Sequence, residues 1–234
     1  MAGTSRFVRR PTWLTWASGL PEMALGVAFF VTWVDPDRLG RSMVSFALEL
    51  MLLEFILIHS AGFMAAKTAD RESTAMRIAG IGGLGLFYSL FVGAFCLALH
   101  RIRPLVSFWV VTAQRIAGDV IDPRPSDETR AWFGTSLAVN VILYLGIVTF
   151  TVLVPLPPLG ITPGVAQSVG VHGSGLWQSQ PQTVVVLAGG YYGIRGLLTA
   201  TAWPRRAIAP DRTVAGQVGP IARASTGIFR KPGA

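Results

Sequence analysis

The sequence predicts an all-α membrane protein, a polytopic helix bundle with six transmembrane helices and both termini in the cytoplasm. The first observation is composition, because 51% of the 234 residues are hydrophobic and only 14% are charged. A water-soluble protein of this size would need a more charged exterior. The second is a series of apolar runs of about the 20 residues that cross a bilayer as a helix. The third is the alternation of basic linkers along the chain, which follows the positive-inside rule.

The apolar runs divide the chain into a leading segment, a membrane domain and a basic tail. Residues 1–12 precede the first run, and residues 204–234 form a tail rich in Gly, Pro and Arg that we expect to be irregular. The fourth run is the shortest and contains Gln114, Arg115 and Asp119. The predicted spans are residues 13–34, 43–66, 78–99, 105–121, 132–154 and 183–203.

The first run follows three arginines and so has one feature of a signal peptide. It extends from Trp13 to Val34, however, and Asp-Pro-Asp follows it instead of a small-residue cleavage pattern. We therefore expect a first span that the protein retains.

Basic residues lie mostly on one side of the predicted bundle. The leading segment, the linkers after spans two and four, and the tail together hold fourteen Lys and Arg residues, whereas the other linkers hold four. Positive residues stay on the cytoplasmic side. The net charge of +8 is thus explained by topology and by lipid headgroups as partners, and not by nucleic acid. The single cysteine, Cys96, excludes a disulfide within the chain.

The second run places Glu49, Glu54 and His59 inside a predicted transmembrane helix. Ionisable groups at that depth are costly and usually face the bundle interior, a cavity or a partner. Spaced five residues apart, they point about 140° apart around the helix and lie about 7.5 Å apart along it. Metal ligands on one helix need spacings of three or four. We therefore predict no metal site and no cofactor, and assign Glu49 to a separate contact in the outer half.

Most of the other polar residues within the predicted spans share one half of the bilayer, the cytoplasmic half. One interpretation is a polar vestibule that opens to the cytoplasm, with Glu54 at its deep end. The alternative is mutual neutralisation, because Arg115 and Asp119 are spaced to pair along one helix. Glu54, near the midplane, is expected to be protonated, or paired with His59 or with an arginine from another helix. The candidate intramembrane site comprises Glu22, Glu54, His59, Arg115, Asp119, Asn140 and Arg195.

Glycines gather in spans three and six. Gly80, Gly82 and Gly85 match a dinucleotide-binding pattern, but no strand precedes them, so they indicate close helix packing. Gly189 and Gly193 form a Gly-x-x-x-Gly pair, which also indicates close helix packing. These two spans are where we expect contact with a protein partner or a second copy of the chain.

The linker of residues 155–182 contains no Lys, Arg, Asp or Glu and has five prolines. A solvated disordered loop would carry charge, so we expect this linker to lie on the bundle or to dip into the interface, with Trp177 as a secondary site residue. Whether it is a passive connector or a lid is open.

Two segments resemble those of a bacterial family of uncharacterised polytopic membrane proteins. They are the stretch from Leu52 to Phe63, LLEFILIHSAGF, and the stretch from Gly173 to Trp177, GSGLW, followed by Pro181. The resemblance implies a fold and a location, the bacterial inner (plasma) membrane. It favours Glu54, His59 and Trp177 as the residues to test.

Three functions follow from these observations. The first is a small permease-like protein, or a component of one, in which Glu54 and His59 relay a proton or an ion. The second is a non-catalytic accessory subunit of a membrane complex, docked through its glycine-rich spans. The third is an intramembrane enzyme or redox subunit. The sequence contains no recognisable nucleophile–base set, and this favours the first two.

Overall fold

The computed structural model describes residues 12–68, 73–121, 127–171 and 175–201. Residues 1–11 of the leading segment and the whole basic tail lie outside this part of the chain. All regular elements among the described residues are helices. The long ones are α1 (Thr12–Val34), α3 (Ser42–Thr68), α4 (Thr74–Leu99), α5 (Arg103–Ile121), α6 (Asp127–Leu153) and α9 (Pro181–Ala200). The short ones are α2 (Pro36–Leu39), α7 (Pro163–Ser168) and α8 (Leu176–Ser179).

Five of the long helices are long and apolar enough to cross a membrane. The qualifying segments are Trp16–Val34, Ser42–Ala66, Thr74–Leu99, Arg130–Leu153 and Pro181–Ala200. Helix α5, which corresponds to the predicted fourth span, has 19 residues but is not among them. Its Arg103, Arg115 and Asp119 account for the difference, since charged side chains lower the hydropathy of a short helix.

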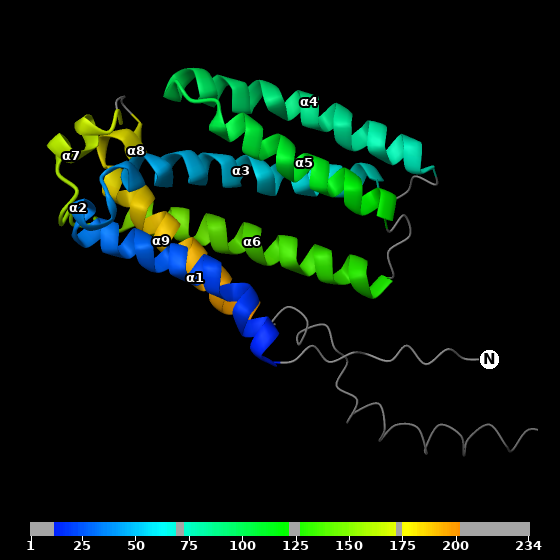
Figure 1. Ribbon diagram of the computed structural model, residues 1–234, viewed down its shortest axis with the longest axis horizontal. Coiled ribbons are helices and arrows are strands. Elements are labelled where there is room, and N and C mark those ends of the chain that lie inside the picture. The colour runs from blue at the N-terminus through cyan, green and yellow to red at the C-terminus, as the bar shows by residue number, and fades with distance from the viewer. Residues whose placement is uncertain (1–11, 69–72, 122–126, 172–174, 202–234) are drawn as a thin grey trace, which may run out of the picture.

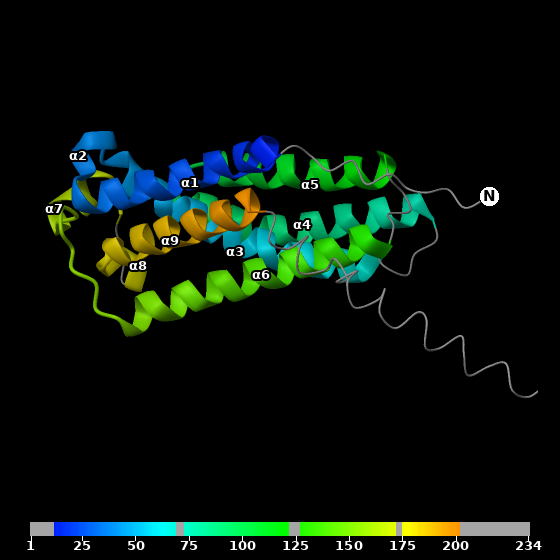
Figure 2. The same ribbon diagram turned by 90° about the horizontal axis from the view of Figure 1, so that it is seen from below.

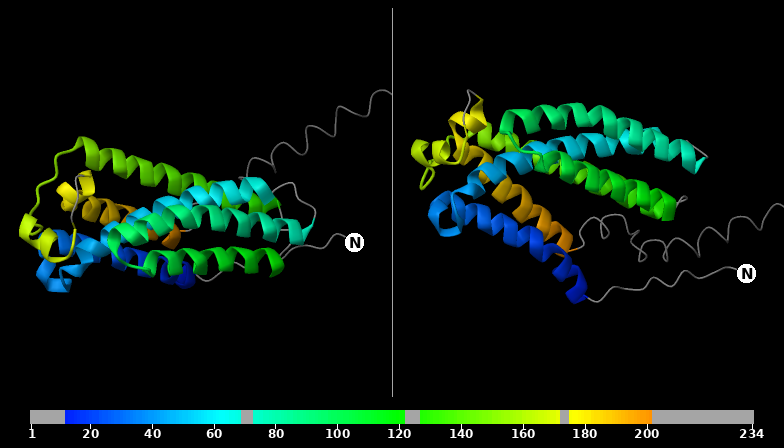
Figure 3. Two further views of the ribbon diagram at one scale, coloured as in Figure 1. Left: turned by 90° about the horizontal axis from the view of Figure 1, so that it is seen from above. Right: turned by 45° about the horizontal axis from the view of Figure 1, so that its top comes forward.

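The long helices lie side by side and alternate in direction, as Figure 1 shows. Helix α1 begins and α9 ends at the same end of the bundle, while α2, α7 and α8 gather at the other end (Figures 1 and 2). Helices α3 and α9 are central: α3 contacts α1, α4, α5, α6 and α9, and α9 contacts α1, α3 and α6. In Figure 1, α4 and α5 lie above α3 and the α1–α9 pair lies below it. Figure 3 shows the short helices at one end of the bundle in two further views.

Helices α1 and α9 approach so closely that glycine is required at their crossing. A Cβ atom added to Gly26 of α1 would lie 2.5 Å from the backbone nitrogen of Gly193. One added to Gly196 of α9 would lie 2.6 Å from the backbone nitrogen of Met23. Small residues allow this approach in membranes, where van der Waals packing replaces the hydrophobic effect between helices. The glycines of α9 therefore pack within the chain.

The core lies between α1, α3, α9 and the segment before α7. Phe29, Met51, Leu187 and Tyr191 are fully buried there, and Ile161 is 1% exposed. The outer faces of α4 and α6 are instead covered by exposed apolar side chains. An interior with buried polar groups and an apolar exterior is the arrangement that a bilayer favours.

The uncharged linker packs onto the end of the bundle as a cap. The indole nitrogen of Trp33 donates to the carbonyl of Pro157 at 2.9 Å, and the backbone nitrogen of Gly160 donates to the carbonyl of Trp33 at 3.1 Å. Trp177 is half-buried against the core. The linker thus lies on the bundle, as expected; its role as a connector or a lid stays a prediction.

Candidate functional site

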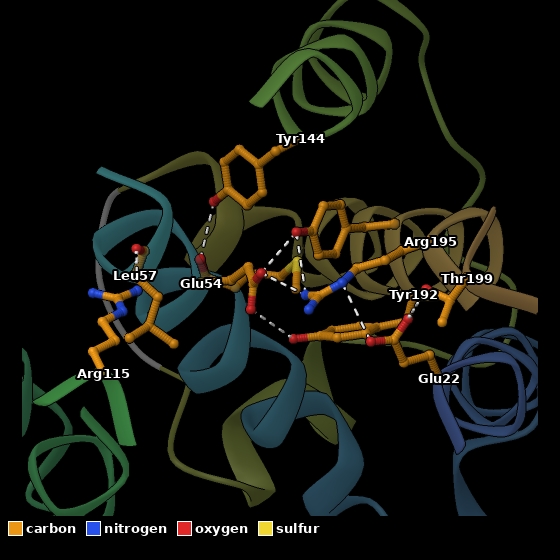
Figure 4. Close-up of polar contacts among 10 residues, drawn as sticks. Glu22, Glu54, Leu57, Arg115, Tyr144, Tyr192, Arg195 and Thr199 are labelled. Atoms are coloured by element: carbon orange, nitrogen blue, oxygen red, sulfur yellow. Dashed lines mark hydrogen bonds and ion pairs between the residues drawn. The ribbon is translucent and has the colours of Figure 1, made fainter. Parts of the chain in front are cut away.

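Glu54 lies near the middle of α3, about 18 Å along the helix from Ser42 at 1.5 Å per residue. Its side chain points toward α9 and is buried among aromatic rings (Figure 4). The leucine-rich turns on either side form helix readily, and they place this carboxyl group in an apolar environment. A buried carboxyl group needs hydrogen-bond donors around it.

Helix α9 supplies these donors. The hydroxyl of Tyr191 donates to Oε1 of Glu54 at 2.7 Å, and Nη1 of Arg195 donates to the same oxygen at 2.7 Å. The hydroxyl of Tyr192 donates to Oε2 at 3.2 Å. Both carboxyl oxygens therefore accept hydrogen bonds, one of them from a cation. Of the two partners expected for Glu54, His59 and an arginine from another helix, the structure shows the arginine.

Arg195 also contacts an acid of α1. Its Nε atom lies 3.3 Å from Oε1 of Glu22, and the hydroxyl of Thr199 donates to Oε2 of Glu22 at 3.4 Å. The guanidinium carbon lies 5.7 Å from the ring centre of Tyr191, one helical turn earlier, within cation–π range. Three helices, α1, α3 and α9, thus meet at one guanidinium (Figure 4).

We call this set the Glu54 cluster; it consists of Glu22, Glu54, Tyr191, Tyr192, Arg195 and Thr199. Two carboxyl groups share one guanidinium, so with both acids ionised the cluster carries one net negative charge. The side chain of Glu54 is 11% exposed, whereas those of Glu22 and Arg195 are 26% and 29% exposed. Glu54 is therefore the most enclosed of the three charged groups.

His59 is not part of the cluster. Its Nδ1 atom lies 2.9 Å from the carbonyl oxygen of Phe55, and its ring centre lies 4.2 Å from that of Phe55. The polar contacts of Glu54 with described residues are those to α9, and His59 is not among them. Their five-residue spacing directs the two side chains to different faces of α3.

Arg115 of α5 contacts α3 on the side of that helix that faces away from the Glu54 cluster (Figure 4). It donates to the carbonyl of Leu57 and to the hydroxyl of Ser60, both at 3.0 Å, and its Nη1 lies 3.2 Å from the sulfur of Met64. These contacts join α5 to α3. The side chain of Asp119 lies outside the described residues, so its pairing with Arg115 stays a prediction.

Asn140 and Glu49 also lie apart from the cluster. Asn140 is half-buried on α6 and is not among the described residues that hydrogen-bond Glu54. Glu49 is 7% exposed and forms an ion pair with Arg101, which also lies 3.4 Å from the hydroxyl of Ser45. This is the separate contact expected for Glu49.

Sequence reasoning placed Glu22, Glu54 and Arg195 in one candidate site, and the structure brings these three together. It missed Tyr191, Tyr192 and Thr199 as their partners. One signal was available, because Tyr191 and Arg195 are four residues apart and so lie on one helix face. The sequence gave no such signal for Tyr144 of α6, whose hydroxyl donates to the carbonyl of Met51 of α3 at 3.0 Å.

Among the described residues, no group of three or more His, Cys, Asp or Glu side chains is arranged to hold a metal ion. Comparison of the sequence with protein-family models gave no match, and neither the curated proteins nor the solved structures gave one. The site is therefore interpreted from its own geometry.

Proposed function

We propose that the protein is a small permease-like membrane protein, or the permeation component of a complex, in which the Glu54 cluster couples movement of a solute or ion to protonation. The observation that carries the proposal is the sharing of one guanidinium, Arg195, by two carboxyl groups on different helices. Protonation of either acid leaves Arg195 paired with the other. Intramembrane ionisable residues of this kind are typical of proton relays and ion pathways.

The cluster joins the α1–α9 pair to α3. Glu22 and Arg195 lie on α1 and α9, which are joined by the close glycine contacts, whereas Glu54 lies on α3. Protonation of Glu54 removes the charge that holds Arg195 to α3 and leaves the Glu22–Arg195 pair intact within the α1–α9 pair. The α1–α9 pair can then shift against α3, a rigid-body step of the type that alternating access requires.

Protons reach the cluster through Glu22. Its side chain is more exposed than that of Glu54, and it shares Arg195 with it. A proton taken up at Glu22 weakens the Arg195–Glu22 contact and strengthens the hold of Arg195 on Glu54. Loss of that proton restores the shared state. The two acids therefore act in sequence, and substitution of either one interrupts the relay.

We propose six spans with both termini in the cytoplasm of a bacterial inner membrane. Support comes from the alternating direction of the six long helices, which brings the start of α1 and the end of α9 to one end (Figure 1), and from the basic residues that the sequence places on that side. In this arrangement α5 crosses as the fourth span with Arg115 turned toward α3. The family resemblance of Leu52–Phe63 is part of this proposal.

Proton flux into liposomes tests the proposed function. The full chain is reconstituted with a pH-sensitive dye inside the vesicles, and a potassium gradient with valinomycin drives uptake. We expect Glu54→Gln and Glu22→Gln each to abolish flux while the folded yield by size-exclusion chromatography is kept. Glu49→Gln, an acid paired elsewhere on the same α3, is the matched control and should keep flux. Normal flux in Glu54→Gln would exclude the proposal.

A second candidate function, an accessory subunit, has one observation in its favour. On α4, Gly80, Gly82, Gly83 and Gly93 have no atoms within 4 Å of an added Cβ, and large apolar side chains beside them are exposed. This open face would admit a partner helix. Purification in mild detergent distinguishes the two: a stoichiometric partner, with no flux from the isolated chain, would favour the accessory subunit.

A further inference from the structure

A groove between α3 and α6 lies apart from the Glu54 cluster. Its volume is about 410 Å³, within the range of small-molecule sites. Nine of its ten lining residues are apolar or aromatic, and the tenth is His59. The residues are Phe55, Ile58, His59, Gly62, Phe63, Ala66, Leu137, Val141, Tyr144 and Leu145.

The groove opens on the outer, apolar face of the bundle. Phe55, Phe63 and Leu145 on its rim are 41%, 57% and 50% exposed. In a membrane this face contacts lipid, so a molecule dissolved in the bilayer enters the groove sideways without crossing water. From Phe55 to Ala66 the groove extends about 16 Å along α3 at 1.5 Å per residue. It therefore accommodates an elongated apolar molecule.

His59 supplies a hydrogen-bond acceptor within this apolar lining. Its Nδ1 lies 2.9 Å from the carbonyl oxygen of Phe55. Because a carbonyl oxygen only accepts, the hydrogen of the neutral imidazole is on Nδ1, and Nε2 presents a lone pair. The hydroxyl of Tyr144 is engaged by the carbonyl of Met51, so Tyr144 offers the groove its ring. The lining selects a molecule that donates a hydrogen bond.

Aromatic side chains narrow the class of molecule further. Phe55 packs against His59 with ring centres 4.2 Å apart and against Tyr144 with ring centres 6.2 Å apart. Aromatic pairs favour such offset or tilted contacts, and a ligand ring can extend this series toward Phe63. The groove therefore fits a molecule with three parts: an apolar tail for the apolar lining, an aromatic headgroup for the ring contacts, and a hydroxyl that donates to His59.

We propose that the α3–α6 groove binds a membrane quinol, with a quinol hydroxyl donating to Nε2 of His59. The oxidised quinone has carbonyl oxygens in place of the hydroxyls. A carbonyl oxygen and the lone pair of Nε2 are both acceptors, so they form no hydrogen bond. The site therefore prefers the reduced form. No electron transfer is part of the proposal, and it stands independently of the function proposed for the Glu54 cluster.

Equilibrium binding of decylubiquinol and decylubiquinone to the full chain in nanodiscs tests this. We expect the quinol to bind about tenfold more tightly than the quinone, the size of one buried hydrogen bond. His59→Ala should remove the preference, and Ala66→Leu, which fills the groove from an exposed position, should weaken both ligands. His100→Asn, at an exposed histidine outside the groove, is the control and should bind like the unaltered chain.

Four results would overturn the proposal. Three of them are equal binding of quinol and quinone by the unaltered chain, an unchanged preference in His59→Ala, and unchanged binding in Ala66→Leu. Competition by palmitoyl lipid as strong as by the quinol would likewise show that the groove holds ordinary acyl chains. Size-exclusion profiles matching the unaltered chain ensure that each variant is compared in its folded form.

Discussion

Arg195 of α9 and Glu54 of α3 are 141 residues apart in sequence. Nη1 of Arg195 nevertheless lies 2.7 Å from Oε1 of Glu54 in the interior of the bundle. The pair is asymmetric in its surroundings, because the side chain of Glu54 is 11% exposed and that of Arg195 is 29% exposed. Removing one partner of a buried pair leaves an uncompensated charge, whereas replacing both can be nearly neutral. This asymmetry gives the first prediction.

Arg195→Gln should destabilise the protein by about 2–3 kcal/mol, below the usual range for a fully buried pair because the guanidinium is partly exposed. The substitution leaves Glu22 and Glu54 without their shared cation. Unfolding in dodecyl maltoside with SDS as denaturant, followed by circular dichroism, measures the change.

The double variant Arg195→Gln with Glu54→Gln should recover much of this loss, since an amide at position 54 still accepts from Tyr191 and carries no charge. The control is Arg41→Gln. Arg41 pairs with Asp37 at 2.6 Å on the exposed surface, and its hydrogen bond holds the pKa of Asp37 below its usual value. That exposed pair contributes little to stability. If Arg41→Gln lowered the free energy of unfolding as much as Arg195→Gln, the difference expected between an exposed and a buried ion pair would be contradicted.

Gly26→Ala should separate α1 from α9. The added methyl group would lie 2.5 Å from the backbone nitrogen of Gly193, and backbone atoms cannot rotate away as a side chain can. We expect a loss of about 2–3 kcal/mol, in the upper range for overpacking, together with a lower folded yield. The measurement is the same SDS unfolding.

Gly193→Ala is the matched control on the facing helix. A Cβ at this position meets no atom within 4 Å. Alanine should therefore be neutral or should stabilise α9 by about 0.5–1 kcal/mol through helix propensity. Equal losses in the two variants would show that the glycines act through something other than close contact.

Gly160→Ala should loosen the cap. An added methyl group would lie 2.5 Å from both the carbonyl oxygen of Val34 and the ring of Pro36, where the cap is hydrogen-bonded to Trp33. Limited proteolysis should cleave the linker of residues 155–182 several times faster than in the unaltered chain, since cleavage follows local opening. Gly164→Ala, with its nearest neighbour 3.9 Å away, should be cleaved at the original rate. Equal rates for all three proteins would argue against a packed cap.

The fold class followed from the sequence because lipid imposes a simple rule: apolar runs of sufficient length become helices. Within the described part of the chain five helices meet that rule, and the run with Arg115 does not, which leaves the sixth crossing as a prediction. The candidate site was only partly predictable. Helix periodicity separated Glu54 from Glu49. His59 was expected to act with Glu54, and the structure instead pairs its Nδ1 with the carbonyl oxygen of Phe55, because periodicity along α3 does not show what the facing helices supply.

Which helices meet at Glu54 depends on packing across the bundle, and that information is not local in sequence. Arg195 was a candidate because charge in a span is rare. Tyr191 and Tyr192 were not predicted as site residues, because tyrosine is common at the edges of spans and its hydroxyl partner cannot be inferred without the facing helix. The glycines were predicted to pack, but the helix that they contact, α1, was not.

His100 ends α4 in a left-handed conformation, with φ at 52°, and its backbone nitrogen donates to the carbonyls of Cys96 and Leu97. This conformation favours glycine, because a Cβ atom crowds the following carbonyl. His100→Gly should therefore stabilise the protein by about 0.5–1 kcal/mol in SDS unfolding. Ala98→Gly, two residues earlier in the same helix, should instead cost about 1 kcal/mol, since glycine there only adds freedom to the unfolded chain. A destabilising His100→Gly would show that the imidazole contributes more than the strain relief gains.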